Sequence, residues 1–157
     1  MPATRVFISY STADSAFADQ LEAQLTAAGY DVFRDKTGMT AGPLDSQLKK
    51  QIDDIDALIL VFSKNAIGSD WVEWEVQMAR NREKRDGIRL LCPIQLDDSW
   101  RTAPWRGPLM HQIQDYFIVD FSAEFKRPFQ RLREGLERWY GPGDAAPLVQ
   151  TAQADDS

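Results

Sequence analysis

The 157-residue chain has one cysteine and one histidine, and each scarcity excludes a class of site. With Cys92 alone it forms no internal disulfide, no cluster of zinc thiolates and no CxxC redox pair. With His111 alone it has no pair of histidines to hold a metal. A serine or cysteine nucleophile activated by a histidine would depend on that one residue. We therefore expect no metal site, and chemistry based on carboxylates, hydroxyls, the backbone or a borrowed cofactor.

The sequence also has no excess of positive charge and no long apolar run, the features that nucleic-acid binding and membrane insertion require. The chain has 18 Lys and Arg against 24 Asp and Glu, a net charge of −6, which makes it a poor general binder of phosphate backbones. No apolar run approaches the ~20 residues that span a bilayer, and no signal-peptide pattern precedes Arg5. These patterns predict a cytoplasmic protein that binds neither nucleic acid directly nor a membrane.

Short runs rich in β-branched and aromatic residues recur along the chain and predict strands. Ala57–Phe62 consists of six consecutive apolar residues, which is typical of a strand covered on both faces within a parallel sheet. Pro93, inside a later run, indicates a strand that lies near a sheet edge or ends early. The predicted strands are Arg5–Tyr10, Asp31–Arg34, Ala57–Phe62, Ile88–Leu96 and Tyr116–Phe121.

The segments between these runs carry apolar residues at helical spacing. Phe17, Leu21 and Leu25 recur every four residues after side chains that can act as helix N-caps. Asp35–Pro43 contains two glycines and a proline and predicts an exposed loop. The possible N-cap residues are Ser11, Thr12 and Asp14, and the predicted helices contain Phe17–Leu25, Leu44–Ile55, Ser69–Lys84 and Phe125–Trp139.

Strands alternating with helices predict an α/β fold of the flavodoxin-like, doubly wound type. We expect a five-stranded parallel sheet with helices on both faces, formed by residues 5–140. Residues 1–4 then form an N-terminal tail. Residues 141–157 begin with Gly-Pro-Gly, carry three Asp but no Lys or Arg, and are expected to form a disordered tail or a linker. In such folds ligands bind beyond the carboxyl ends of the strands, which selects Ser9–Asp14, Arg34–Pro43 and Ser63–Glu75.

Common nucleotide and hydrolase motifs are missing. No GxGxxG follows the first strand, and the chain contains neither GxxxxGK[ST] nor GxSxG. A receiver domain shares the length and the alternation, but it places paired acids after the first strand and a phosphorylatable Asp after the third. Those positions hold Ser9–Ser11 and Ser63 here, which argues against a receiver.

The third predicted helix places a carboxylate on an apolar face. At about 100° per residue, Glu75 falls within the apolar arc, one turn after Trp71. A charged Glu is rarely buried without a partner. Glu75 therefore caps the helix or pairs with an arginine such as Arg34, reaches outward to solvent, or lines a pocket. The other residues of the arc are Val72, Trp74, Val76, Met78 and Ala79.

Four segments together resemble a Toll/interleukin-1 receptor (TIR) domain over about Arg5 to Tyr140. They are RVFISYSTAD at 5–14, DVFRD at 31–35 with the following Gly/Pro loop, ALILVFS at 57–63, and SDWVEWE at 69–75. The later pattern of Asp97–Asp98, Trp100 and Asp120–Ser122 is more similar to bacterial TIR proteins than to animal receptor adaptors.

The resemblance implies one of two functions. Enzymatic TIR domains cleave the nicotinamide–ribose bond of NAD+, releasing ADP-ribose or a cyclised isomer, and bacterial members are often antiphage defence effectors. Adaptor TIR domains act only by associating with other TIR domains. The enzymes carry a Glu at the position of Glu75 and a Trp at the position of Trp71, so the resemblance favours an NAD+ nucleosidase with Glu75 as its catalytic residue.

The resemblance also implies partners and further site residues. NAD+ is the substrate and no cofactor is expected; a homo-oligomer or filament forms through TIR–TIR contacts, and a separate sensor protein or fused domain is possible. Trp71 is then core or pocket wall, Ser11 after Tyr10 is a substrate contact or a helix cap, and Arg34 beside Asp35 binds diphosphate or anchors the loop. The predicted interface residues of the loop are Lys36, Thr37, Gly38, Met39, Gly42 and Pro43.

Overall fold

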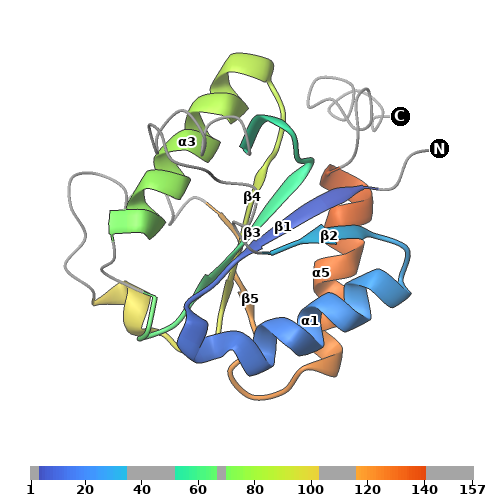
Figure 1. Cartoon of the computed structure of the whole chain (residues 1–157), viewed down its shortest axis with the longest axis vertical. Coiled ribbons are helices and arrows are strands. Elements are labelled where there is room, and N and C mark those ends of the chain that lie inside the picture. The colour runs from blue at the N-terminus through green and yellow to red at the C-terminus, as the bar shows by residue number, and fades with distance from the viewer. Residues whose placement is uncertain (1–3, 35–51, 67–69, 103–115, 141–157) are drawn as a thin grey trace.

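A computed structural model describes residues 4–34, 52–66, 70–102 and 116–140, with side chains in the third of these ranges described from Glu75 onward. Its five strands are all parallel and lie in the order β2-β1-β3-β4-β5, which is the flavodoxin-like order expected from the sequence (Figure 1). The strands are β1 (Arg5–Ser9), β2 (Asp31–Phe33), β3 (Ala57–Phe62), β4 (Leu91–Gln95) and β5 (Val119–Asp120). The helices are η1 (Thr12–Asp14), α1 (Ser15–Ala27), α3 (Asp70–Asp86), η2 (Ser99–Arg101) and α5 (Lys126–Trp139).

Helices cover both faces of the sheet, with α1 and α5 on one face and α3 on the other (Figure 1). The central strand β3 is buried at all six positions, as its uninterrupted apolar sequence predicts. Its side chains alternate, so that Leu58 and Leu60 pack with Val76 of α3, whereas Ile59 packs with Leu21 of α1. Burying these two apolar layers is the main force that fixes the order of the strands.

β4 is shorter than predicted and lies next to the edge strand β5. The backbone N–H of Leu96 donates to the carbonyl of Phe62 in β3, whereas the N–H of Phe121 donates to the carbonyl of Gln95. The backbone N–H and C=O groups of the odd-numbered residues of β4 therefore point toward β5. On that side the N–H of Leu91 donates to the carboxylate of Glu83 at 2.8 Å, and Pro93 has none to offer. β5 therefore pairs only with the carboxyl end of β4, after Pro93, so the missing N–H of Pro93 interrupts no hydrogen bond between the two strands.

The predicted terminal segments, 1–4 and 141–157, lie outside the described residues except for Thr4. Among the described residues, no helix combines the length and the apolar character that a membrane span requires.

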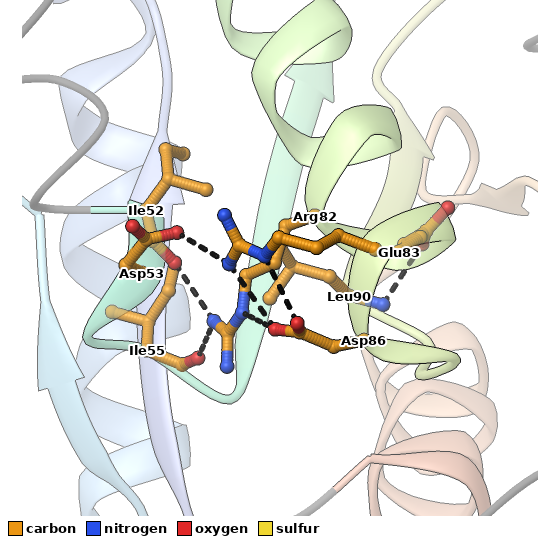
Figure 2. Close-up of polar contacts among 8 residues, drawn as sticks. Ile52, Asp53, Ile55, Arg82, Glu83, Asp86 and Leu90 are labelled. Carbon is orange, nitrogen blue, oxygen red and sulfur yellow. Dashed lines mark hydrogen bonds and ion pairs between the residues drawn. The ribbon is translucent and has the colours of Figure 1, made fainter.

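Arg82 ties the last turns of α3 to the turn that precedes β3 (Figure 2). Its Nη1 donates to the backbone carbonyl oxygens of Ile52 and Ile55, at 2.8 and 2.5 Å. Its Nε lies 3.3 Å from the carboxylate of Asp86, and its side chain is only 15% exposed. Arg85 also forms ion pairs across the same contact, with Asp53 at 3.1 Å and Asp86 at 2.9 Å, but its side chain is more exposed than that of Arg82. These contacts fix α3, which also carries Glu75, against the sheet.

The two arginines differ in expected contribution to stability. Arg82→Ala leaves two carbonyl oxygens without their charged donor, so we expect the free energy of unfolding to fall by about 2 kcal/mol. Arg85→Ala removes the same charge from an exposed pair that solvent screens, and a much smaller loss is expected. Urea unfolding followed by circular dichroism measures both. Equal losses in the two variants would show that the carbonyl contacts of Arg82 do not matter.

Candidate active site

The carboxyl ends of β1 and β3 form the point where the sheet changes direction of winding. The chain leaves β1 for α1 on one face and leaves β3 toward α3 on the other (Figure 1). In doubly wound sheets this divergence opens a crevice in which ligands bind. The residues that follow the two strands, Tyr10–Asp14 and Ser63–Ala66, therefore mark the first place to look for a site.

Glu75 lies fully buried near the carboxyl end of β1, with 0% of its surface exposed. The hydroxyl of Ser9, the last residue of β1, donates a hydrogen bond to its Oε1. Phe7, two residues earlier on the same strand, packs in the core cluster that contains residues of α3, so the alternation of β1 aims Ser9 at that helix. The predicted placement of Glu75 on the apolar face of its helix is confirmed, its reaching outward to solvent is excluded, and the hydrogen bond from Ser9 offsets part of the cost of its burial.

Asp14 joins the loops that follow β1 and β3. Its Oδ2 accepts a hydrogen bond from the Ser63 hydroxyl at 2.5 Å, and its Oδ1 accepts one from the Asn65 amide at 3.0 Å. Asp14 makes no side-chain cap to α1, which corrects the sequence expectation of a helix cap at this position. The carboxylate instead links the segment after β1 to the turn after β3.

Asp97, after β4, holds the same turn from the other side. Its carboxylate accepts hydrogen bonds from the backbone N–H groups of Lys64 and Ser99, each at 3.0 Å. Burial works against the charged form, but the hydrogen bonds from Ser99 and Lys64 outweigh it and hold the pKa of Asp97 below its usual value. The turn after β3 is thus fixed by two carboxylates before the chain enters the segment leading to α3.

Trp100 packs against the sheet rather than facing a neighbour. It is 3% exposed, and its indole N–H donates to Oε1 of Gln95 at 2.7 Å. Its ring lies 6.1 Å from that of Phe62, centroid to centroid. These contacts hold the segment after β4 against the sheet.

The contacts of Tyr10, Ser11 and Arg34 agree with the non-substrate roles considered for them, namely a helix cap and an anchoring ion pair. Ser11 caps η1, accepting from the backbone N–H of Ala13 at 3.3 Å. The guanidinium of Arg34 pairs with Asp19 at 2.6 Å and with Glu22 at 3.1 Å, both on α1. It also lies 5.0 Å from the centre of the Tyr10 ring. These contacts anchor the end of β2 to α1, and a substrate role for the three residues stays a prediction.

Other predicted site residues lie outside the described part of the chain. The backbone of Trp71 belongs to the first turn of α3, but its side chain is not described. Asp35 and all the interface residues predicted in the loop lie wholly outside the described residues; those of the loop are Lys36, Thr37, Gly38, Met39, Gly42 and Pro43. Within the described ranges, no group of three or more His, Cys, Asp and Glu side chains is placed to hold a metal ion.

The comparisons with known proteins agree with this architecture. The family profile of the TIR domain matches residues 6–133, most of the chain. A search of curated proteins returned no match. Among solved structures, the chain is similar to the TIR domains in the activated Roq1 resistosome directly recognizing the pathogen effector XopQ, with a TM-score of 0.63 and 18% identity over 85% of this chain and 99% of that one. The chain therefore belongs to the TIR domain family.

Proposed function

We propose that this TIR domain is an NAD+ nucleosidase that cleaves the nicotinamide–ribose bond. The observation that supports this proposal most strongly is the carboxylate of Glu75, buried beside the Ser9 hydroxyl at the switch point of the sheet. Taking a carboxylate out of water lowers stability unless hydrogen bonds or a partner charge compensate, so buried acids are often kept where function requires them.

The reaction needs little beyond such a carboxylate. As the bond between ribose C1′ and the pyridine nitrogen breaks, its electron pair stays on the nitrogen and nicotinamide leaves as a neutral molecule. The ribose becomes oxocarbenium-like, and a fixed negative charge stabilises it more strongly in a site from which water is excluded. Glu75 supplies that charge, and its carboxylate can also accept hydrogen bonds from the ribose hydroxyls.

The nucleophile determines the product. Water attacks C1′ and loses a proton to give ADP-ribose, whereas an adenine nitrogen or ribose oxygen of the same molecule gives a cyclic isomer. We propose further that a neighbouring subunit completes the site through residues 35–43, so that activity requires a homo-oligomer or filament. Head-to-tail contacts that do not close generate filaments. In this proposal the protein is a cytoplasmic antiphage effector of bacterial type, triggered by a separate sensor or a fused domain.

A second candidate function is that of a non-enzymatic adaptor, which acts through TIR–TIR contacts alone. The complete burial of Glu75 favours it, because a carboxylate that merely links β1 to α3 would be enclosed in the same way. Under this alternative Ser9 and Glu75 are structural partners and NAD+ is not a ligand.

Mass spectrometry of the products distinguishes the two functions. The full chain is incubated with NAD+ across a range of protein concentrations, because assembly is required in the proposal and dilute protein would be inactive. We expect nicotinamide together with ADP-ribose or a cyclic isomer, at a rate that rises more steeply than the protein concentration. Intact NAD+ at concentrations where the protein is shown to be assembled would favour the adaptor.

A further inference from the structure

A groove of about 1160 Å³ runs over the side of the sheet where β4 and β5 lie, and Ser9 and Glu75 are not among its lining residues. Its floor includes Cys92 and Pro93 of β4 and Val119 of β5, at the part of β4 that β5 does not cover. One wall is formed by α3 from Arg80 onward, and the other by α5 from Arg131 onward. α3 and α5 lie on opposite faces of the sheet (Figure 1), so a groove lined by residues of both helices passes around the sheet edge.

The groove gathers positive charge in a chain whose net charge is −6. Of the three acidic side chains that line it, two already interact with other parts of the protein. Glu83 accepts hydrogen bonds from the backbone of Leu90 and Leu91, and Glu137 lies 3.6 Å from Arg133. The side chains that line it carry five positive and three negative charges, namely Arg80, Lys84, Arg89, Arg131 and Arg138 against Glu83, Glu134 and Glu137. The excess favours an anionic occupant.

The same walls present flat surfaces. The guanidinium of Arg89 lies 5.2 Å from the ring centre of Trp139, and that of Arg80 lies 5.5 Å from the ring centre of Tyr116. Phe117 is 72% exposed, an unusual state for an aromatic ring in a small domain. Aromatic rings and arginine planes are the surfaces on which nucleobases stack.

Gly135 is an independent sign that space beside α5 is used. A glycine inside a helix is less stable than alanine, so its presence calls for a reason. Packing gives none here, since a Cβ built on Gly135 meets nothing within 4 Å. Gly135 lines the groove, where the missing side chain lets a ligand approach the helix backbone.

We propose that this groove binds a nucleoside phosphate. The phosphates lie against the cations of the α5 wall, chiefly Arg131 and Arg138, and the base stacks on the aromatic and guanidinium planes at the ends of the groove. The site is separate from Glu75, which does not line the groove and accepts a hydrogen bond from Ser9 at the carboxyl end of β1. It does not depend on the proposed cleavage of NAD+.

Calorimetric titration of the full chain with ADP tests the site. We expect one equivalent to bind, equally to the wild-type chain and to Glu75→Ala, so that the result is independent of any cleavage activity. Arg131→Ala and Gly135→Gln are each expected to weaken binding at least about 10-fold, by loss of a charged contact and by obstruction. Arg127→Ala is the matched control, because it removes the same charge from α5 at a residue that is 79% exposed and does not line the groove.

Gly135→Gln separates binding from folding, because glutamine is the better helix former and the variant should melt at or above the wild-type temperature. Adenosine and pyrophosphate titrated separately should each bind more weakly than ADP. The proposal is wrong if millimolar ADP gives no binding, if pyrophosphate binds as tightly as ADP, or if Arg127→Ala weakens binding as much as Arg131→Ala. It is also wrong if Glu75→Ala alone abolishes binding, since ADP would then occupy the candidate active site.

Discussion

Glu75→Gln is expected to reduce NAD+ cleavage by at least about 10³-fold while leaving the fold intact. Glutamine has nearly the same shape as glutamate, and its amide oxygen still accepts the hydrogen bond that Ser9 donates to Oε1. What it loses is the negative charge that stabilises the oxocarbenium-like ribose. The rate of nicotinamide release at a protein concentration that supports assembly measures the loss directly.

The control for this experiment is Glu124→Gln, which removes one negative charge from a side chain that is 50% exposed. It should retain the wild-type rate, because a solvated charge outside the site is screened. The melting temperature of each variant shows whether the fold persists. Cleavage by folded Glu75→Gln at more than a tenth of the wild-type rate would assign Glu75 to a structural role and show that another group stabilises the ribose.

The fold could be predicted from the sequence because its signals are local. Six apolar residues in Ala57–Phe62 leave no polar face, so this strand had to be central, and the structure buries all six. The limits of β4 were less predictable. They depend on Glu83, whose carboxylate accepts a hydrogen bond from the N–H of Leu91, the group that would otherwise face β5. Such competition from a side chain leaves no trace in hydrophobic periodicity.

The candidate site was predictable only in part, for a related reason. The burial of Glu75 follows from its position on the apolar arc of one helix. Its contact with Ser9 joins residues 66 positions apart, and the contact between Asp14 and Ser63 joins residues 49 apart. Both require the register of β1 against β3, which the sequence does not specify. A signal for Ser9 did exist, since it is a small polar residue at an inward position of an apolar strand.

Ser9→Ala is expected to lower kcat for NAD+ cleavage by about 10- to 100-fold with little change in KM, because a hydrogen bond to a charged group contributes roughly that much. In this proposal Ser9 is a positioning residue that orients Glu75 and favours its ionised form. Without the hydroxyl the buried carboxyl is easier to protonate. The acid limb of the pH–rate profile should therefore move to higher pH, and Ser9→Thr, which keeps a hydroxyl, should restore it.

Ser63→Ala distinguishes positioning from packing. Ser63 is 2% exposed and Ser9 is 3% exposed, and each hydroxyl donates to a carboxylate at the same edge of the sheet. Both alanine variants should therefore lower the melting temperature to a similar extent. Only Ser9→Ala removes a hydrogen bond from Glu75, so only that variant should shift the acid limb. If both variants shift the acid limb equally, the effect comes from looser packing at the carboxyl ends of β1 and β3, and Ser9 has no specific role in holding the carboxylate.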